Sequence, residues 1–441
     1  MGLQLPRLHV VSEPFQGERL YFQFGVNCMK KLLILGAGAG GTMIATKMRK
    51  LLSEREWEIT LIDRDPIHHY QPGWLLVPFG VDTPQGCVRP KKDFISRGVN
   101  FVIDTINAVD PISRKVECQN GTYTYDWIII GTGARIAPDE VPGLLDDWGG
   151  KIHNFYTPDG AAALYEKLKR FKKGRLVLHI CETPIKCPVA PLEFVYMADW
   201  YLQKMGVRQN VEIELVTPLT GAFTKPVANN ILGALCEQKG IKVTTNWTVD
   251  SVEADRAVIA SVTGDEIPYD LLVTIPPNLG QEFLIDSEVS DVTGYVDTDK
   301  ELLRAKKFDN MYIVGDATNV PASKAGSVAH FEVDVIAQNL MSDIEGTDNY
   351  YRFDGHTNCF IVTGFEKASL IDFSYAVEPL PGMFPLPGVG PFELLGESHI
   401  NYWGKLMFKW VYYNLMLKGH ELPFEPNMYL AGKDTSLLRN K

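Results

Sequence analysis

The chain has 441 residues, of which 45% are apolar and 22% charged, and its formal net charge at pH 7 is −11. This composition is ordinary for a soluble globular protein, and the length predicts two or three domains. The charge argues against nucleic acid as the main partner, and the seven unpatterned cysteines argue against a secreted disulfide scaffold. No run of 18 or more apolar residues occurs, so we predict no membrane-spanning helix.

Residues 1–28 differ from the rest of the chain. They show no clear period and precede Met29-Lys30-Lys31, which is a natural start. The stretch ERLYFQF is similar to an engineered protease site. We therefore expect a non-native or disordered extension, and Cys28 enters no functional expectation.

The segment KLLILGAGAGGTMIATKMRKLL (31–52) predicts a strand, a glycine turn and a helix. Gly36, Gly38 and Gly41 form a GxGxxG pattern, which provides a tight turn, close approach of a pyrophosphate and close helix packing. The helix N-terminus favours phosphates. Asp63 ends the next strand, EITLID, and suits a ribose hydroxyl. The pattern predicts a dinucleotide site rather than a plain turn.

Strands and helices alternate along the rest of the chain, and the span 151–275 repeats the alternation of the first part. Strands are predicted at 101–106, 115–118, 125–134 and 311–319, and helices at 190–205, 227–239 and 327–344. The series predicts an α/β fold with two Rossmann-like doubly wound domains, the second inserted in the first. Residues 346–441 are richer in proline, glycine and aromatic residues.

Two distant turns indicate which dinucleotide binds. IGTGA (130–134) ends a strand at the crossover between the domains and supplies Thr132 and Gly133, and IVGDA (313–317) ends a later strand. The turns resemble signatures of the two-dinucleotide-fold flavoprotein reductases, which implies that Asp316 contacts the ribityl chain of FAD. We therefore predict FAD, bound non-covalently because no cysteine stands at an obvious attachment point.

Lys324 and Gly326 open the helix that follows Asp316. The N-terminus of this helix would point at the flavin pyrimidine ring, where a positive dipole stabilises an anionic reduced flavin. The alternative is that Lys324 is a solvated surface lysine.

The inserted domain lacks the second glycine fingerprint of pyridine-nucleotide-dependent enzymes. That fingerprint should follow RLVLHI, but no glycine occurs from His179 to Phe194, in HICETPIKCPVAPLEF. Side chains and fixed proline φ angles oppose the approach of a pyrophosphate, and VEIELVTP ends without an acid or arginine for the ribose. We predict no NAD(P)H site, so electrons must reach the flavin from a smaller donor.

Cysteines are the candidates for handling that donor, because thiols are nucleophiles towards sulfur and flavin. Cys187, Cys359 and Cys181 are the candidates, and the helix after Cys187 is expected to lower its pKa. The alternative is a small buried hydrophobic residue, which applies most to Cys181. The other cysteines are expected to be core or surface residues: Cys87, Cys118 and Cys236.

From Met29 to Gly432 the sequence resembles the sulfide:quinone oxidoreductases. The resemblance rests on GAGAGG, the GTGA and GDA turns, CPVAPLE, a late cysteine followed by phenylalanine, YNLMLKG and MYLAGK. HYQPG, KCPVAPLEF and PLPGVGPF place it nearest the subgroup called type III. The subgroup remains a prediction.

The resemblance implies that Cys187 and Cys359 flank the flavin and perform the sulfur chemistry, and that Glu193 relays protons. It also implies that Phe360 contacts quinone. Many members have an earlier cysteine near GTGA that this chain lacks, so Cys181 is the candidate for its role.

Quinones are flat and apolar, so aromatic contacts are expected, with Phe360, Phe384 and Tyr402 as candidates. The stretch 399–420 has three lysines and no Asp or Glu. Its aromatic and apolar residues have helical spacing: Tyr402, Leu406, Trp410 and Tyr413. We predict a monotopic anchor at the cytoplasmic face of the cell membrane, through which quinone enters. The alternative is an ordinary helix packed on the FAD domain.

We expect FAD-dependent oxidation of sulfide to polysulfide or sulfur, starting with HS⁻ attack on an oxidised Cys187–Cys359 bridge and ending with electron transfer to quinone. The alternatives are a type II NADH:quinone reductase, which the missing fingerprint opposes, and a flavocytochrome-type sulfide dehydrogenase, which needs a haem partner. A non-catalytic flavoprotein sensor is a further alternative. No metal is expected, since His68 and His69 belong to no cluster with ligand spacing.

The domain boundaries follow from these expectations, and the oligomeric state stays open, with a homo-oligomer among the options. The predicted domains are FAD-binding parts at 29–145 and 281–345, a second Rossmann-like domain at 146–280, and a quinone and membrane region at 346–441.

Overall fold

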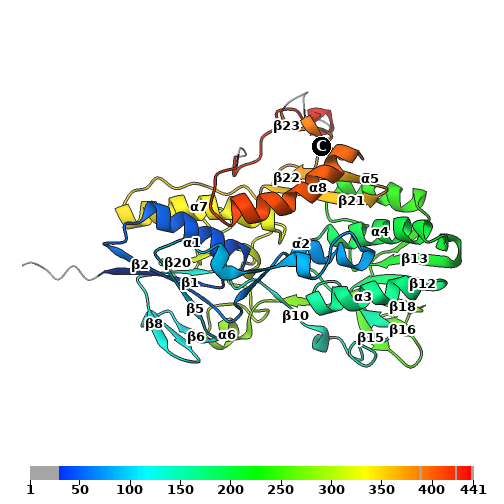
Figure 1. Ribbon diagram of the computed structural model, residues 1–441, viewed down its shortest axis with the longest axis horizontal. Helices are drawn as coiled ribbons and strands as arrows, with labels where there is room; N and C mark the ends of the chain where they lie inside the picture. The colour runs from blue at the N-terminus through cyan, green and yellow to red at the C-terminus, as the bar shows by residue number, and fades with distance from the viewer. Residues whose placement is uncertain (1–28, 387–389, 423–424, 439–441) are drawn as a thin grey trace, which may run out of the picture.

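The computed structural model describes residues 29–386, 390–422 and 425–438 (Figure 1). The predicted extension over 1–28, with Cys28, lies outside the described residues, as does the middle of PLPGVGPF. Two parallel sheets occupy the two halves of the molecule, and the C-terminal elements run along its upper side in Figure 1.

The first half is a parallel sheet covered on both faces. Its elements are β1 (Lys30–Leu35), α1 (Ala39–Leu51), β2 (Trp57–Asp63), β5 (Val99–Ile103), β6 (Ile106–Asp110), β7 (Lys115–Cys118), β8 (Thr122–Thr124), β9 (Trp127–Ile130), α6 (Glu282–Asp286), β20 (Met311–Ile313) and α7 (Gly326–Glu345). The strand order is β20-β9-β1-β2-β5. The apolar run 32–35 lies in the middle strand and is buried on both faces, as a parallel sheet requires. Helices α1 and α7 cover one face, and α6 with β6-β7-β8 covers the other.

The second half repeats this design. Its elements are β11 (Ile152–His153), α3 (Pro158–Arg170), β12 (Gly174–Ile180), α4 (Ala190–Lys204), β13 (Val211–Val216), α5 (Pro226–Gln238), β14 (Ile241–Thr244), β15 (Val249–Glu253), β16 (Val258–Ser261), β17 (Glu266–Pro268) and β18 (Leu271–Ile275). The parallel order is β11-β18-β12-β13-β14, with β15-β16-β17 as an antiparallel sheet. Thr157 caps α3 by accepting a hydrogen bond from the Gly160 N–H at 3.0 Å.

The second half is inserted in the first. The chain crosses between them through two paired short strands, β10 (Arg135–Ile136) and β19 (Asn278–Leu279), and β20 then returns to the first sheet beside β9. The predicted α/β class with two Rossmann-like units is therefore confirmed. The domain boundaries stay predictions.

The C-terminal part contains a third sheet and an amphipathic helix. Its elements are β21 (Thr357–Gly364), β22 (Lys367–Phe373), β23 (Gly382–Leu386), β24 (Gly390–Leu394), α8 (His399–Val411) and a π-helical turn (Tyr412–Met416). Ser398 caps α8 by accepting from the Asn401 N–H at 3.1 Å. Gly404 lets α8 approach the sheet, because a Cβ there would lie 2.6 Å from the Phe392 ring and 2.7 Å from the Phe360 ring.

A buried ion network fastens the last residues to this sheet. Asp372 on β22 contacts His356 Nε2 at 2.8 Å through Oδ1 and Lys433 Nζ at 2.5 Å through Oδ2. All three side chains are at most 1% exposed. The His356 ring stacks on Phe331 of α7 with centroids 4.2 Å apart. The network joins the tail, the third sheet and α7.

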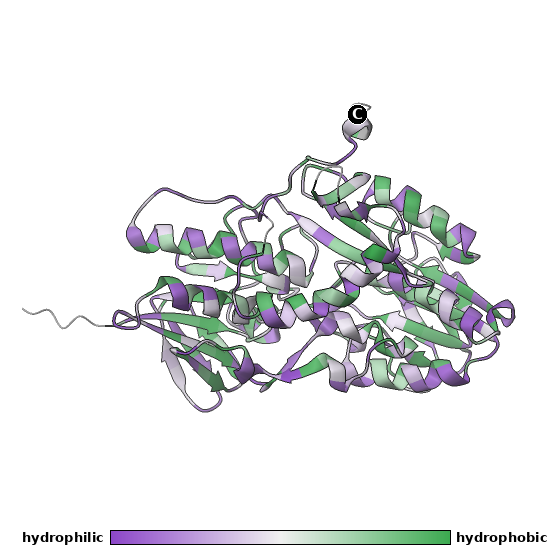
Figure 2. Cartoon of the chain, turned by 45° about the horizontal axis from the view of Figure 1, so that its top comes forward, coloured by the Kyte–Doolittle hydropathy of each residue, from purple (hydrophilic) through white to green (hydrophobic). Residues whose placement is uncertain are grey.

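Short elements complete the fold: β3 (Ile67–His69), α2 (Gln71–Trp74), β4 (Val88–Pro90), and 3₁₀ turns at Val77–Phe79, Gln85–Cys87, Lys91–Asp93, Pro138–Glu140, Arg208–Asn210, Gly315–Ala317 and Thr435–Leu438. Interior strands are hydrophobic, while the helices show hydrophobic and hydrophilic bands (Figure 2). Across the described ranges, every helix is too short or too polar to cross a membrane.

Candidate active site

A long cavity lies where the three parts of the fold meet. Its walls come from the carboxyl ends of β1, β9 and β20, from the loop before α4, and from β21 and α8. Ligands of open α/β sheets bind at the carboxyl ends of the strands, so the topology alone marks this as the ligand site.

The glycine turn forms one end of the cavity. A Cβ on Gly36, whose φ is +90°, would lie 2.5 Å from the Gly131 carbonyl oxygen, and one on Gly41 would lie 1.8 Å from the Gly36 oxygen. These two positions therefore require glycine. Gly38 lines the cavity, and a Cβ there would meet nothing within 4 Å. The space before it is open to a ligand.

Asp63 binds the backbone of this turn and pairs with Lys91, a lysine that no sequence motif predicted. Its Oδ2 accepts from the Ala37 N–H at 2.6 Å and lies 2.8 Å from Lys91 Nζ, while Oδ1 accepts from the Asp65 N–H at 2.9 Å. The Lys91 side chain is 6% exposed and lines the cavity. The carboxylate keeps lone pairs for a ribose hydroxyl, and Lys91 compensates its charge.

Unpaired polar atoms in the wall show that the cavity is built for a polar ligand. Thr132 Oγ1 and Trp74 Nε1 are buried without a hydrogen-bond partner, and both residues line the cavity. Gly133, with φ +65°, lines it beside Thr132. Buried polar groups are almost always paired, so these two atoms call for a bound partner. Trp74 was not among the predicted contacts.

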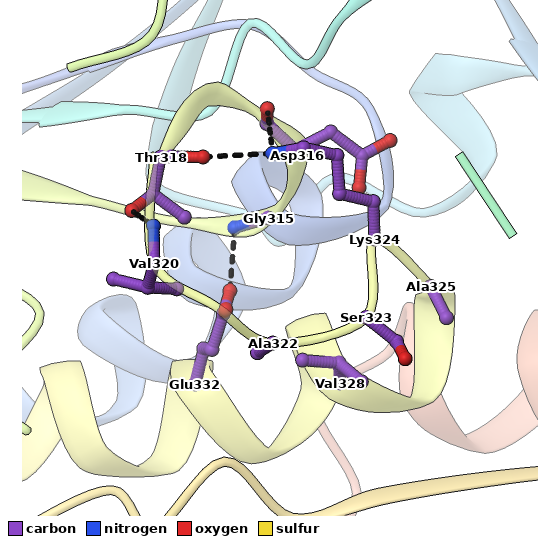
Figure 3. Close-up of a pocket in the computed structure, with 10 residues that line it drawn as sticks. All are labelled: Gly315, Asp316, Thr318, Val320, Ala322, Ser323, Lys324, Ala325, Val328 and Glu332. Carbon is purple, nitrogen blue, oxygen red and sulfur yellow. Dashed lines mark hydrogen bonds between the residues drawn. The ribbon is translucent and has the colours of Figure 1, made fainter. Parts of the chain in front are cut away.

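The GDA turn is held from below by α7 (Figure 3). The Gly315 N–H donates to Glu332 at 2.5 Å, and Lys324 Nζ donates to the carbonyl oxygens of Asp316 at 3.0 Å and Thr318 at 2.7 Å. Lys324 is buried, so the alternative of a solvated surface lysine is wrong. Its ammonium stabilises the turn through these carbonyls.

The Asp316 carboxyl lies in the cavity wall, as does Gly326 at the start of α7. Burial raises the pKa of Asp316, while Lys324 and Lys186 oppose the rise. Helix α7 starts without a side-chain cap, so its first N–H groups are available to a ligand. A glycine turn, two carboxylates and this helix start fit the pyrophosphate, hydroxylated chain and flat ring of FAD.

Two cysteines and a carboxylate lie in the wall of the same cavity. Cys187 precedes α4 with φ +50°, and its N–H donates to the Lys324 carbonyl at 2.7 Å. Cys359 lies on β21. Glu193 on α4 is fully buried; its Oε1 accepts from the Val362 N–H at 2.9 Å, and its Oε2 has no partner. The structure thus brings Cys187, Cys359 and Glu193 to one place.

Both thiols are hard to ionise here. Burial raises the pKa of Cys187 above its usual range, and the charges of Glu193 and Cys359 raise it further. Burial also raises the pKa of Cys359 to about 12. The start of the following helix does lower the pKa of Cys187, through the hydrogen bond with Ala190, but desolvation is the larger effect and the net shift is upward.

A lysine of α8 completes the cluster. Lys405 Nζ donates to Glu193 Oε1 at 2.7 Å and to the Phe360 carbonyl oxygen at 3.1 Å. Its charge lowers the pKa of both Cys187 and Cys359. No sequence pattern indicates this contact, because Lys405 stands among surface-like residues of an amphipathic helix more than 200 positions after Glu193.

Comparisons with known proteins agree with this geometry. Residues 30–178 match the family model described as pyridine nucleotide-disulphide oxidoreductase. The mitochondrial sulfide:quinone oxidoreductase of Mus musculus is 27% identical over 418 residues, covering 92% of this chain and 91% of that protein. That of Dictyostelium discoideum is 27% identical over 397 residues, with 88% and 86% covered. The chain is a homologue of the sulfide:quinone oxidoreductases.

Other relatives are more distant. The type II NADH:quinone oxidoreductase of Staphylococcus aureus strain NCTC 8325 is 23% identical over 354 residues, covering 75% of this chain and 87% of that protein. The crystal structure of the sulfide:quinone oxidoreductase from Aquifex aeolicus matches with a TM-score of 0.73 at 19% identity, covering 87% and 92% of the two chains. This match shows that the fold is shared.

The turn between β12 and α4 contains no glycine and contributes reactive and charged side chains to the cavity. It contains Lys186, which is buried, lines the cavity and lies over the Tyr156 ring at 5.9 Å. Burial lowers the pKa of Lys186, and Asp316 opposes this shift. This turn lines the cavity through Lys186 and Cys187, and the absence of a NAD(P)H site stays a prediction.

Cys181 does not join the other two cysteines. It packs in a core cluster with Val177 and Trp247, separate from the cluster against which Cys187 packs. Its Sγ lies 3.3 Å from Thr274 Oγ1 and 3.6 Å from His179 Nδ1, and burial raises its pKa to about 12. Its third-cysteine role stays a prediction.

Of the three aromatic candidates for quinone contact, one lines the cavity and two do not. Phe360 lines the cavity and packs edge-on against Phe392 at 5.1 Å. Phe384 stacks on Tyr429 at 6.2 Å, and Tyr402 is half-buried against the core; neither lines the cavity. The quinone role of each stays a prediction. The structure adds other aromatic side chains to the wall: Phe408 and Tyr412.

His68 and His69 also lie in the cavity wall. His68 Nε2 is 2.7 Å from the Tyr412 hydroxyl, and burial lowers the pKa of His68 to about 4, so the ring is neutral near pH 7. The described part of the chain contains no group of three or more His, Cys, Asp or Glu residues that could hold a metal ion.

Helix α8 presents a different face to solvent from the one predicted. Tyr402 and Leu406 are partly buried and Tyr413 is buried, so that face turns inward. The exposed apolar residues form another stripe: Ile400 at 52%, Trp403 at 63%, Met407 at 62% and Trp410 at 58%. Trp410 is the one residue of the predicted face that lies in the exposed stripe.

Proposed function

We propose that this chain is an FAD-dependent sulfide:quinone oxidoreductase. The observation that supports this most is that Cys187 and Cys359 both lie in the wall of the dinucleotide cavity. Cys187 lies at the turn where a nicotinamide site would need glycines, and Cys359 lies on β21. FAD, when bound, supplies the two-electron acceptor that links sulfur oxidation to quinone reduction.

The cysteines carry the sulfur chemistry. HS⁻ attacks a Cys187–Cys359 disulfide; one S–S bond breaks, a new S–S bond forms, and the products are a cysteine persulfide and a thiolate. The proton of HS⁻ passes to the unpartnered Oε2 of Glu193, which leaves the persulfide as its anion beside the thiolate. Each further sulfur added towards polysulfide requires another two-electron oxidation of the cysteine pair, for which FAD, when bound, would be the acceptor. Cys181 remains a candidate for a third sulfur position.

The cofactor contacts follow from the cavity wall. The proposed residues are Gly36, Gly38, Gly41, Asp63, Thr132, Gly133, Asp316, Lys324 and Gly326. The backbone glycines make room for the pyrophosphate, and Asp63 and Asp316 take hydroxyl groups. The proposed domain boundaries remain 29–145 with 281–345, 146–280 and 346–441.

We propose that quinone enters from a membrane surface on which α8 lies. Four exposed apolar residues on one face of an amphipathic helix are typical of a helix that lies in the membrane interface. Phe408 of α8 and Phe360 of β21 contribute aromatic side chains to the cavity wall. The proposed location is the cytoplasmic face of the cell membrane.

The decisive experiment is anaerobic addition of sulfide to the purified protein loaded with FAD. Bleaching of the flavin absorbance, followed by recovery on adding a quinone analogue, is expected. Cys359→Ala abolishes the bleaching, whereas Cys118→Ala, a buried cysteine of β7, retains it. A flavin that ignores sulfide but is bleached by NADH favours a type II NADH:quinone reductase instead.

A further inference from the structure

Helix α8 has two opposite faces with different surroundings. At 100° per residue, Lys405 lies opposite the exposed stripe of Trp403, Met407 and Trp410. Its side chain is 10% exposed, and its ammonium lies against Glu193. A single helix therefore meets solvent on one side and the cysteine cluster on the other.

Three segments packed around Lys405 contribute charged, titratable or polar groups. Helix α4 contributes Glu193, the loop before it contributes Cys187, and β21 contributes Cys359 with the Phe360 carbonyl. Behind Cys359 lie the Ser327 hydroxyl, which lowers the pKa of that thiol, and Asp372, which raises it.

The charges in this cluster do not balance throughout the proposed reaction. With the cysteines bridged, Glu193 and Lys405 form a neutral pair. HS⁻ then brings one negative charge into a buried site, where an unpaired charge is strongly disfavoured. Two other lysines lie nearby, but Lys186 and Lys324 both interact with the Asp316 carboxylate.

We propose that Lys405 is the charge-balancing residue of the sulfur chemistry, pairing with Glu193 while the bridge is closed and with the thiolate once sulfide has opened it. This inference rests on the proposed function. The proton carried in by HS⁻ neutralises Glu193 through its free Oε2, which releases the ammonium to the sulfur. Lys405 acts on the reacting sulfur electrostatically and belongs to the helix proposed to lie on the membrane.

The support from ionisation agrees with this geometry. Although burial alone lowers the pKa of Lys405, interactions with Glu193, Cys187 and Cys359 raise it overall, so the ammonium stays charged. The same lysine opposes the rise in the pKa of both thiols.

The test compares Lys405→Met, Lys405→Arg and Glu193→Gln with Lys409→Met as control. Lys409 lies one turn further along α8 and pairs with Asp82 at 2.6 Å, outside the cysteine cluster. After reduction, the two cysteines are titrated by the pH dependence of their alkylation, located by mass spectrometry. FAD content and unfolding temperature show that each variant is folded.

Lys405→Met shifts the titration of at least one thiol upward by about one pH unit or more, a tenfold loss of thiolate at fixed pH. Lys405→Arg restores most of the loss. Glu193→Gln shifts the titration downward, because the carboxylate raises the pKa of Cys187. Lys409→Met leaves both thiols unchanged.

Thiol titrations of Lys405→Met that match those of Lys409→Met overturn the proposal. If Lys405→Met fails to fold, the opposite shift in Glu193→Gln and rescue by Lys405→Arg still decide it. The alkylation assay needs no turnover, so a protein that ignores sulfide but shows these shifts contradicts the proposed function and leaves only the electrostatic effect of Lys405 on the two thiols.

Discussion

The buried network of Asp372, His356 and Lys433 gives the sharpest prediction for stability. Lys433→Met removes the cation from a carboxylate that is 1% exposed, while its stem length is kept. Removing one partner of a buried ion pair costs about 3–5 kcal/mol, because the remaining charge is left without compensation. His356 keeps its contact at 2.8 Å and offsets part of this loss.

The matched control is Lys306→Met. Lys306 pairs with Asp297 at the same kind of distance, 2.8 Å, but the two side chains are 56% and 45% exposed. Exposed pairs contribute about 0–1 kcal/mol, so this variant should unfold close to the parent temperature. Because both variants replace lysine with methionine, the comparison isolates the effect of burial on the contribution of an ion pair to stability.

Thermal unfolding of the FAD-loaded protein, followed by circular dichroism, measures both variants. At about 2 °C per kcal/mol, Lys433→Met should lower the midpoint by up to about 6–10 °C, reduced by the part that His356 offsets, and Lys306→Met by no more than about 2 °C. Equal shifts in the two variants would refute the reasoning, because the network would then contribute no more than a surface pair.

Three further outcomes are expected. Gly41→Ala should abolish FAD retention, because its Cβ would lie 1.8 Å from the Gly36 oxygen, whereas Gly233→Ala on α5, where a Cβ meets nothing within 4 Å, should retain full cofactor content after purification. The stability of the reduced protein should fall as pH rises above 9, because the thiols of the unfolded chain ionise there while Cys359 in the folded protein stays protonated up to about 12. Chemical denaturation at pH 8 and pH 10 measures this effect, and equal stability at both would contradict it. Trp403→Gln should weaken co-sedimentation with lipid vesicles without slowing flavin reduction by sulfide, and unchanged binding would remove this face of α8 from the membrane proposal.

The sequence predicted the backbone-determined part of the site well. Glycines at fixed spacing after an apolar run leave few conformations, and Gly36 and Gly41 have the close contacts that the motif requires. The apolar runs and their alternation likewise predicted both parallel sheets. These features depend on local sequence, which is why they could be inferred without contacts.

The ionic part of the site was not predictable in the same way. Lys91, Lys405 and Lys186 become important only through partners that are distant along the chain or brought close by a turn. The net direction of the Cys187 pKa shift was not predictable for a related reason. The lowering effect of the helix start can be inferred from sequence, but the larger desolvation depends on the complete packing around the thiol.

The face of α8 shows a further limit. Periodicity predicts a helix with two faces, but both faces here contain apolar and aromatic residues, so hydropathy alone does not decide which one packs inward. The cap at Ser398 and the close approach at Gly404 fix the orientation, and both depend on the third sheet.

The cavity wall is assembled from nearly opposite ends of the polypeptide, with Gly36 near the beginning and Lys405 and Tyr412 near the end. A ribosome adding about 5–20 residues per second needs roughly 20 to 75 seconds to make the roughly 370 residues between them. The glycine turn and its sheet are therefore exposed for that whole interval before the wall from α8 exists. Cofactor loading during synthesis would meet an open groove, and enclosure of the flavin would be one of the last events in the maturation of each molecule.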